Sequence, residues 1–385
     1  MKGVTPPSTE ERSGADRLRY WLALTFIREI GPITIKKLLS AFHTPKKILA
    51  ASKKELMQVG DIKESRARAI REFDAWQLVD QEISKIGELG IQAVTFDDSA
   101  YPVSLRQIDD SPVLFYIKGE IKDEDRYAIG IVGSRDMTPY GRKIADAFSS
   151  ELASKGLTIV SGMARGIDTA AHKGALRVKG RSIAVLGCGI DTPYPPENSG
   201  LYDELSLSGA VISEFPLGTP PLRENFPKRN RLISGLSLGV LIVEATAGSG
   251  SLITANCALD QGKDVFAVPG NITSMNSVGT NGLIKKGAKL VQKADDVLAE
   301  LTPMLRGLLY AEGQKTGPDL ITNLDALEIN AEERAICSVL GSEPRHIDII
   351  SRETGIAAQR ISGILLDLEL KGIVRQAEGK RFFIA

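Results

Sequence analysis

One short stretch of the sequence concentrates basic and aromatic side chains. Between two apolar segments it reads FPKRNR, and Arg223 stands three positions before it. A positive groove holds the phosphates of a single nucleic-acid strand without reading its sequence, and aromatic rings stack on its bases at about 1–3 kcal/mol each. We therefore predict a basic loop that binds a polyanion; a solvated loop with an inward ring and paired surface charges is the alternative. The residues concerned are Phe226, Lys228, Arg229, Asn230 and Arg231.

Glycine-rich turns are the second group of candidates. They follow short apolar runs, in the stretches GIVGSRD, IVSGMARGID and TAGSGSLIT. Glycine lets the backbone approach an anion closely, and neighbouring serine and arginine side chains add hydrogen-bond donors. Together with the basic stretch, these turns predict a binding site for phosphate groups. Their candidate residues are Gly133, Ser134, Arg135, Ser161, Gly162, Gly166 and Ser249.

The same stretches lack the signatures of common nucleotide-dependent enzymes. GIVGSRDMTPYG does not have the G-x-G-x-x-G spacing of a dinucleotide site, and GSGSLIT lacks the lysine of a phosphate loop. Asp168 and Glu244 could act as an acid or a base, but we expect them to cap a helix or anchor an arginine. His172 is expected to be an ordinary helix residue. We therefore assign no catalytic residue and expect neither a cofactor nor a metal.

Apolar runs bounded by glycine predict the sheet that would position these groups. From Tyr127 onward they alternate with helix-length amphipathic segments, which is typical of a parallel sheet covered on both faces. The turns after parallel strands meet at one edge of the sheet. The preceding stretch 91–119 is expected to extend it. The predicted fold class is therefore α/β, with a doubly wound, Rossmann-like sheet over residues 86–302. Its runs are YAIGIVG, LTIVSG, SIAVLG, AVISEF, VLIVEA, DVFAVPG and AKLV.

An N-terminal helical domain is expected over residues 17–80. YWLALTFIREI and ITIKKLLSAF carry apolar residues at three- and four-residue spacing. IREIGPITIKKLLSAF and LMQVGDIKESRARAI then repeat one plan, in which a glycine turn precedes a helix. The repeat resembles a SAM-like pair of helix-hairpin-helix units. Such turns can present backbone N–H groups to DNA phosphates, whereas a helical packing or protein-docking domain is the other interpretation.

The C-terminal part reads as a linker and a small module. Residues 303–330 are punctuated by glycine and proline, which predicts a linker. Residues 331–385 read as three helices and a ribbon, an order that resembles a winged helix with its wing turn at 376–380. This module carries eight Lys/Arg and eight Asp/Glu, so it has no net charge with which to release counterions from DNA. We expect it to dock protein or to support a dimer.

Composition limits the class of protein. Of 385 residues, 43% are hydrophobic, and Lys+Arg and Asp+Glu are balanced at 48 each, so a polyanion site must be local. The N-terminal stretch is polar, and no run approaches the roughly 18 apolar residues of a membrane span, which predicts a cytoplasmic protein without membrane contact. Cys188, Cys257 and Cys337 lack metal-ligand spacing, and we expect all three to be small buried hydrophobic residues.

The motifs occur together, in order, in one protein family. They resemble those of the DNA-processing protein A (DprA/Smf) family over nearly the whole chain. The resemblance implies a helical N-terminal domain, an extended Rossmann domain and a C-terminal winged helix. The stretches that carry it are YPVSLRQIDDSPVLFYIKG, IVGSRDMTPYG, IVSGMARGIDTAAHKGAL, AVLGCGIDTPYPPEN, SEFPLGTPP, FPKRNRLISGLS, VLIVEATAGSGSLITANCALDQG and FAVPGNITSMNSVGTNGLIKKGA.

The resemblance also implies a function. Proteins similar to this one bind and protect incoming single-stranded DNA during natural transformation and help to load the RecA recombinase, as homodimers and with single-strand-binding protein as a further partner. The implied DNA pocket contains Ser134, Arg135, the turn at 161–166, Arg223 and the stretch that begins at Phe226. A Rossmann nucleotide-binding enzyme similar to phosphoribohydrolases is the alternative. Its PGG-x-GT signature is absent, and PGNITSMNSVGTNG is the nearest stretch.

Overall fold

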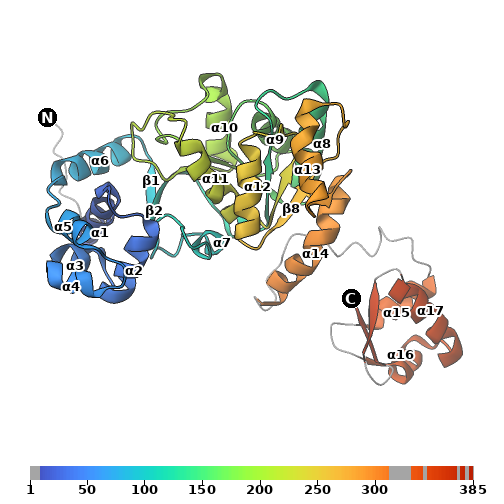
Figure 1. Ribbon diagram of the computed structural model, residues 1–385. Coiled ribbons are helices and arrows are strands. Elements are labelled where there is room, and N and C mark those ends of the chain that lie inside the picture. The colour runs from blue at the N-terminus through green and yellow to red at the C-terminus, as the bar shows by residue number, and fades with distance from the viewer. Residues whose placement is uncertain (1–8, 312–330, 341–344, 371–372, 378–380, 385) are drawn as a thin grey trace, which may run out of the picture. The chain divides into compact units, whose positions relative to one another are not determined.

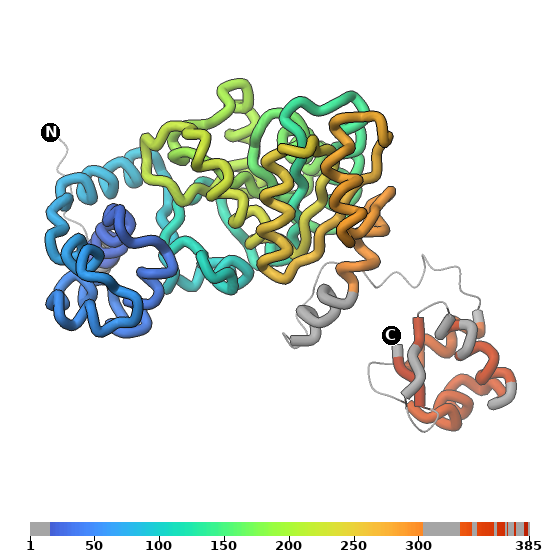
Figure 2. The backbone as a smooth tube through the Cα atoms, in the orientation of Figure 1, coloured from blue at the N-terminus to red at the C-terminus, as the bar shows by residue number. Residues whose placement is uncertain are grey.

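Two units make up the chain, Met1–Lys315 and Thr316–Ala385. The computed structural model (Figure 1) describes residues 9–311, 331–340, 345–370, 373–377 and 381–384. Each unit has hydrophobic clusters of its own, and the path of the backbone through each can be followed in Figure 2.

A nine-stranded sheet runs through the first unit in the order β1-β2-β6-β5-β4-β3-β7-β8-β9. Strands β3 to β9 pair in parallel, whereas β1 and β2 run antiparallel to their neighbours. The apolar runs form these strands because both faces of the sheet are buried. The predicted doubly wound α/β fold is confirmed. The strands are β1 (Gln92–Thr95), β2 (Leu114–Gly119), β3 (Ala128–Val132), β4 (Thr158–Ser161), β5 (Ser182–Val185), β6 (Ala210–Ser213), β7 (Gly239–Ile242), β8 (Asp264–Ala267) and β9 (Lys289–Leu290).

Helices cover both faces of this sheet (Figure 1). Successive side chains of a strand point to opposite faces. Accordingly, Ile129 and Ile131 of β3 pack in the cluster that contains residues of α8 and α9, and Val132 packs in the cluster that contains residues of α11 and α12. The helices are α7 (Val103–Arg106), α8 (Pro139–Ser154), α9 (Ile167–Arg177), α10 (Ser199–Ser208), α11 (Asn225–Leu236), α12 (Ser251–Asp260), α13 (Val278–Lys285) and α14 (Ala294–Ala311).

Two segments predicted to be irregular are helical. The basic stretch lies in α11, so the prediction of a loop there is wrong. Pro227 is compatible with this helix because it lies in the first turn, where backbone N–H groups have no intrahelical acceptor. Helix α14 continues to Ala311, into the stretch 303–330 that the sequence predicted as a linker. Residues 312–330 lie outside the described residues.

Six helices precede the sheet, as the apolar spacing predicted, although they extend from Thr9 to Glu88. Their core is continuous with residues of the sheet. Glu82 of α6 is buried, and its carboxylate accepts hydrogen bonds from the hydroxyl of Tyr116 at 2.7 Å and from the backbone N–H of Leu217 at 2.8 Å. These helices are therefore anchored on the sheet. They are α1 (Thr9–Phe26), α2 (Pro32–Phe42), α3 (Pro45–Ala50), α4 (Lys53–Gln58), α5 (Glu64–Arg71) and α6 (Trp76–Glu88).

The second unit has the order helix, strand, helix, helix, strand, strand that is typical of a winged helix. Its three strands pair in the order β10-β12-β11. Of the predicted wing turn at 376–380, residues 378–380 lie outside the described residues. The predicted winged-helix fold is confirmed. Its elements are α15 (Ala331–Val339), β10 (Arg345–His346), α16 (Ile347–Thr354), α17 (Ala358–Leu370), β11 (Val374–Ala377) and β12 (Arg381–Ile384).

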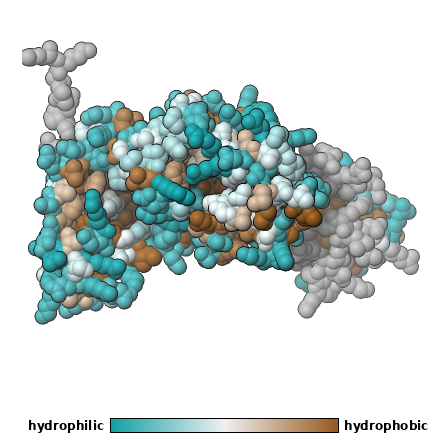
Figure 3. All heavy atoms as spheres, turned by 45° about the horizontal axis from the view of Figure 1, so that its top comes forward, coloured by the Kyte–Doolittle hydropathy of each residue, from teal (hydrophilic) through white to brown (hydrophobic). Residues whose placement is uncertain are grey.

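The surface is mostly hydrophilic with scattered hydrophobic patches on the face seen in Figure 3. None of the helices in the described ranges is both long and apolar enough to cross a bilayer. Cys188 and Cys337 are buried, as predicted, and burial raises the pKa of the Cys188 thiol to about 11. Cys257 is only half-buried, so the prediction of full burial is wrong for this residue.

Candidate nucleic-acid interface

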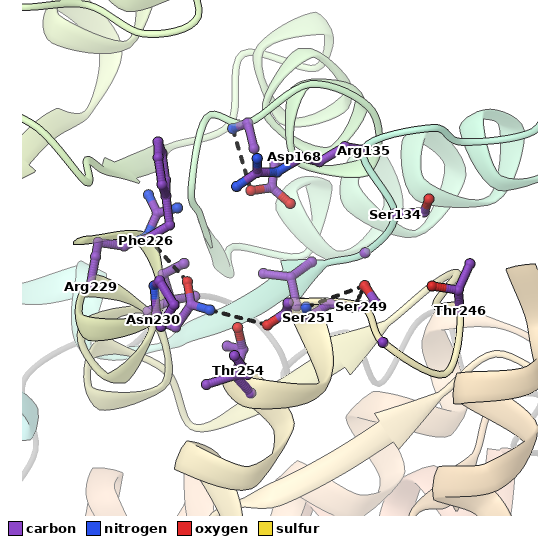
Figure 4. Close-up of a pocket in the computed structure, with 18 of the residues that line it drawn as sticks. Ser134, Arg135, Asp168, Phe226, Arg229, Asn230, Thr246, Ser249, Ser251 and Thr254 are labelled. Carbon is purple, nitrogen blue, oxygen red and sulfur yellow. Dashed lines mark hydrogen bonds between the residues drawn. The ribbon is translucent and has the colours of Figure 1, made fainter. Parts of the chain in front are cut away.

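A pocket of about 470 Å³ lies at the carboxyl ends of β3 and β7 (Figure 4). The strand order changes direction at this point of the sheet, because β3 has β4 on one side and β7 on the other. Ligands of open α/β sheets bind at such a switch point. The pocket is built by the loop after β3, the start of α9, the first part of α11, and the loop and first turn after β7. Its polar lining residues are Ser134, Arg135, Asp136, Asp168, Arg223, Arg229, Asn230, Thr246, Ser249, Ser251, Thr254 and Asn276.

The structure brings together predicted residues from three separate segments of the sequence. Those that line the pocket are Gly133, Ser134, Arg135, Arg223, Phe226, Arg229, Asn230 and Ser249. Among the described residues, the predicted ones that do not line it are Ser161, Gly162, Gly166, Lys228 and Arg231.

Helical geometry separates the residues of the basic stretch. Positions three and four apart share a face of a helix, so Phe226, Arg229 and Asn230 reach the pocket together. Arg231 points elsewhere, and its guanidinium forms an ion pair with Glu214. A loop could present every basic side chain to one ligand, whereas this helix divides them between the pocket and other surroundings.

The turn after β4 supports the pocket without lining it. The hydroxyl of Ser161 is buried and donates to a backbone carbonyl of β3 at 2.6 Å. Gly166 adopts a φ of 79°, and a Cβ there would lie 2.2 Å from the carbonyl oxygen of Ser134. The carbonyl of Gly162 accepts a hydrogen bond from Arg229 at 2.8 Å. These residues therefore shape the segments that carry the lining side chains.

Arg135 and Phe226 contact each other across the pocket. The guanidinium carbon of Arg135 lies 4.9 Å from the centroid of the Phe226 ring, a distance at which cation–π attraction is favourable. The ring of Tyr194 packs beside Phe226, with 5.7 Å between ring centroids. A Cβ on Gly187 would lie 2.9 Å from the Phe226 ring, so glycine provides the space that the ring occupies. The Phe226 ring is thus held in place before any ligand binds.

Arg229 is the buried cation of the pocket, with only 3% of its surface exposed. Its guanidinium donates to the side-chain oxygen of Asn230 and to the carbonyls of Gly162 and Val185. In the described part of the chain, no carboxylate forms an ion pair with it. Burial lowers the pKa of Arg229 to about 10, so the side chain still carries its charge at neutral pH. The carboxylate of Asp168 attracts Arg229 through space without forming an ion pair with it. Because a buried charge is costly unless it is paired, Arg229 favours an anionic ligand.

Asp168 and His172 lie one helical turn apart on α9, and both are buried. Burial raises the pKa of Asp168 to about 6, and Arg229 opposes that rise. The carboxylate accepts a hydrogen bond from the backbone N–H of Ala164 at 3.4 Å. Burial lowers the pKa of His172 to about 3, so its ring is neutral, and its Nδ1 lies 2.7 Å from the hydroxyl of Ser182. The His172 ring is therefore buried against Ser182 of β5 rather than presented to a ligand.

Glu244 caps a helix, as the sequence analysis favoured. Its buried carboxylate accepts hydrogen bonds from the backbone N–H and the hydroxyl of Thr138, the N-cap residue of α8. A Cβ on Gly141 would lie 2.3 Å from this carboxylate, so the helix approaches it closely. Within the described ranges, no group of three His, Cys, Asp or Glu side chains is placed to hold a metal ion. The arrangement suits binding of an anion and an aromatic base.

Some lining residues were not foreseen. Ser251 and Thr254 lie three positions apart on the first turn of α12, so the helical spacing after GSGS was a usable signal. Thr246 precedes that loop. Asn276 comes from the segment after β8, and its amide donates to the carbonyl of Asp136 at 3.0 Å. Nothing in the local sequence around Asn276 points to the pocket.

The chain matches three families of known domains. The family described as DNA recombination-mediator protein A matches residues 92–302, which span the sheet and the pocket. The DprA winged helix domain matches residues 322–380, and the SAM-like helix-hairpin-helix tandem matches residues 22–73.

Individual relatives agree with these matches. The Smf protein of Escherichia coli is 41% identical over 285 residues, which cover 74% of this chain and 75% of the relative. The crystal structure of DNA processing protein A from Streptococcus pneumoniae superposes with a TM-score of 0.64 at 36% identity, covering 73% of this chain and 97% of that one. The Helicobacter pylori protein, solved for its single-stranded DNA binding mode, superposes with a TM-score of 0.50 at 31% identity, covering 55% and 97%. This chain therefore belongs to the DNA recombination-mediator protein A (DprA/Smf) family.

Proposed function

We propose that this chain binds single-stranded DNA in the pocket at the ends of β3 and β7. The observation that carries the proposal is Arg229, a buried cation that has no ion-pair partner among the described residues. A strand phosphate would pair directly with this guanidinium, while Arg135 would provide a second cation and Phe226 a ring for a base. The single-stranded DNA binding mode of the Helicobacter pylori relative supports this assignment.

All of the predicted site residues except Arg231 have a proposed place in this interaction. Ser161, Gly162 and Gly166 would hold the turn behind the pocket, and the exposed Lys228 would contact the strand beyond it. Arg231 is left out of the contact set because Glu214 engages it. The proposed contact residues are Gly133, Ser134, Arg135, Arg223, Phe226, Arg229, Asn230 and Ser249.

We propose further that the chain is a recombination mediator rather than an enzyme. In this role it would protect incoming single strands in the cytoplasm during natural transformation and present them to the RecA recombinase, as a homodimer and alongside single-strand-binding protein. The family description supports a mediator. The carboxylate of Glu244 accepts hydrogen bonds from Thr138 at the start of α8, which supports a structural role for Glu244 rather than acid–base chemistry. Release of free base from nucleoside monophosphates would instead support the phosphoribohydrolase alternative.

The proposed function predicts a salt-dependent preference for single strands. We expect a labelled oligothymidylate to bind more tightly than duplex DNA, with a log–log salt slope of about −0.7 per phosphate neutralised. Arg135→Ala should make this slope shallower by about 0.7. Fluorescence anisotropy across a salt series measures both effects, and Arg177→Ala, on the exposed surface of α9 and paired with Asp146, is the matched control. Equal affinity for both forms of DNA, or a flat salt response, would contradict the assignment.

The contact between Arg135 and Phe226 predicts coupled effects. Phe226→Ala should weaken binding by about 1–3 kcal/mol through lost stacking, while leaving the salt slope nearly unchanged. The ring also holds the guanidinium at 4.9 Å, so the double variant should lose about 1 kcal/mol less than the sum of the single variants. A double-mutant cycle on oligothymidylate affinity measures this coupling free energy between Arg135 and Phe226. Strict additivity would show that the two side chains bind the strand independently.

A further inference from the structure

Asp168 brings a carboxylate into the cationic pocket. It lies in the first turn of α9, is 6% exposed and contributes to the pocket lining. A Cβ built on Gly162 would lie 2.7 Å from Oδ2 of Asp168 and 2.6 Å from Nη2 of Arg229. Because Gly162 has no side chain, the Asp168 carboxylate from α9 and the Arg229 guanidinium from α11 can both lie beside it.

The charges around Asp168 are predominantly positive. Arg229 from α11 and Arg135 from the loop after β3 both attract its carboxylate through space. On α9 itself His172 is neutral, because burial lowers its pKa to about 3. The Cys188 thiol, which follows β5, is also neutral, because burial raises its pKa to about 11. Asp136 is the other acidic side chain that lines the pocket, and it is exposed.

We propose that Asp168 is an internal competitor of the DNA phosphate. In the free protein its carboxylate balances the charge of Arg135 and Arg229. When DNA binds, a phosphate diester replaces this carboxylate as the anion that interacts with both arginines. This inference rests on the proposed single-strand function of the same pocket. It assigns to Asp168 a role that neither a helix cap nor a packing residue would have, namely control of strand affinity through its charge.

The sign of the resulting pH dependence follows from linkage. Burial raises the pKa of Asp168 to about 6 in the free protein, and a nearby phosphate would raise that pKa further, since like charges disfavour ionisation. Protonation removes the competing charge, so affinity should rise as the pH falls through about 6. By reciprocity, strand binding should itself take up a proton.

The test is calorimetric and begins with the unaltered full chain. Oligothymidylate has no group that titrates between pH 5 and 8, and is therefore a suitable probe. We expect about tenfold tighter binding at pH 5 than at pH 8, and uptake of about half a proton per site at pH 6.5, measured in two buffers of different ionisation enthalpy. D168N should bind about as tightly at pH 8 as the unaltered chain does at pH 5, without proton uptake. D136N removes one negative charge from the exposed part of the pocket lining. This variant should bind more tightly than the unaltered chain by the same factor at every pH, and binding should still take up a proton.

The outcomes separate this inference from the function on which it rests. Binding of oligothymidylate with a flat pH profile and no proton uptake would overturn the role of Asp168 and leave the proposed function intact. Weaker binding by a folded D168N variant at pH 8 would also overturn it, and would make Asp168 a residue that holds the Ala164 turn. Failure of the unaltered chain to bind oligothymidylate at any pH would instead remove the proposed function itself.

Discussion

Gly162→Ala is expected to lower the affinity for single-stranded DNA by about a hundredfold, equivalent to about 2.7 kcal/mol. The new Cβ would lie 2.6 Å from Nη2 of Arg229 and 2.7 Å from Oδ2 of Asp168. Both side chains are buried, and Arg229 is further held by the carbonyls of Gly162 and Val185. The clash must therefore displace the guanidinium from the position in which it faces a ligand.

Anisotropy with labelled oligothymidylate measures this loss, and circular dichroism establishes that the variant is folded. Gly200→Ala in α10 is the matched control, because no atom lies within 4 Å of the Cβ that it would gain. That control should bind as the unaltered chain does. Unaltered affinity in a folded Gly162→Ala variant would show that Arg229 is not held against the ligand.

Lys263→Met is expected to lower the free energy of unfolding of the first unit by about 3 kcal/mol. The side chain is partly buried, and its ammonium donates to three carbonyls around the end of α11, those of Ser234 and Gly235 at 2.7 Å each and that of Ser237 at 2.6 Å. Burial lowers the pKa of Lys263 to about 8, so the charged form is the main one at neutral pH. A cation at the C-terminus of a helix also complements its dipole. Methionine keeps the apolar stem and leaves these carbonyls without their donor.

Urea unfolding followed by tryptophan fluorescence measures this change, because Trp21 and Trp76 both lie in the first unit. Lys289→Met is the control, since Lys289 is half-exposed and, among the residues that the structure describes, pairs with Glu300 at the surface. It should cost less than about 1 kcal/mol. A comparably small loss in Lys263→Met would mean that water replaces the ammonium and that the end of α11 does not depend on it.

The sequence alone was sufficient for the doubly wound sheet. Apolar runs bounded by glycine predicted the strands, because a parallel sheet buried on both faces requires continuous apolar segments. The order of those runs placed their turns at one edge, so the pocket was predictable as a meeting point of several turns. Spacing also indicated the helices around it. What these patterns share is that they depend on neighbours within a few positions of the chain.

The tertiary structure decided which of the candidate residues meet. The FPKRNR stretch carries the same local signal for Arg229 and Arg231, yet the first is buried in the pocket and the second pairs with Glu214. The two side chains have different surroundings because α11 turns by about 100° per residue and because packing against the sheet sets the orientation of the helix. The partners of Arg229 include the carbonyl of Gly162, which is 67 positions away. Contacts between residues so far apart in the sequence are produced only by the fold. The sequence therefore identified the basic residues, but it did not show that Arg229 is the one that faces Asp168.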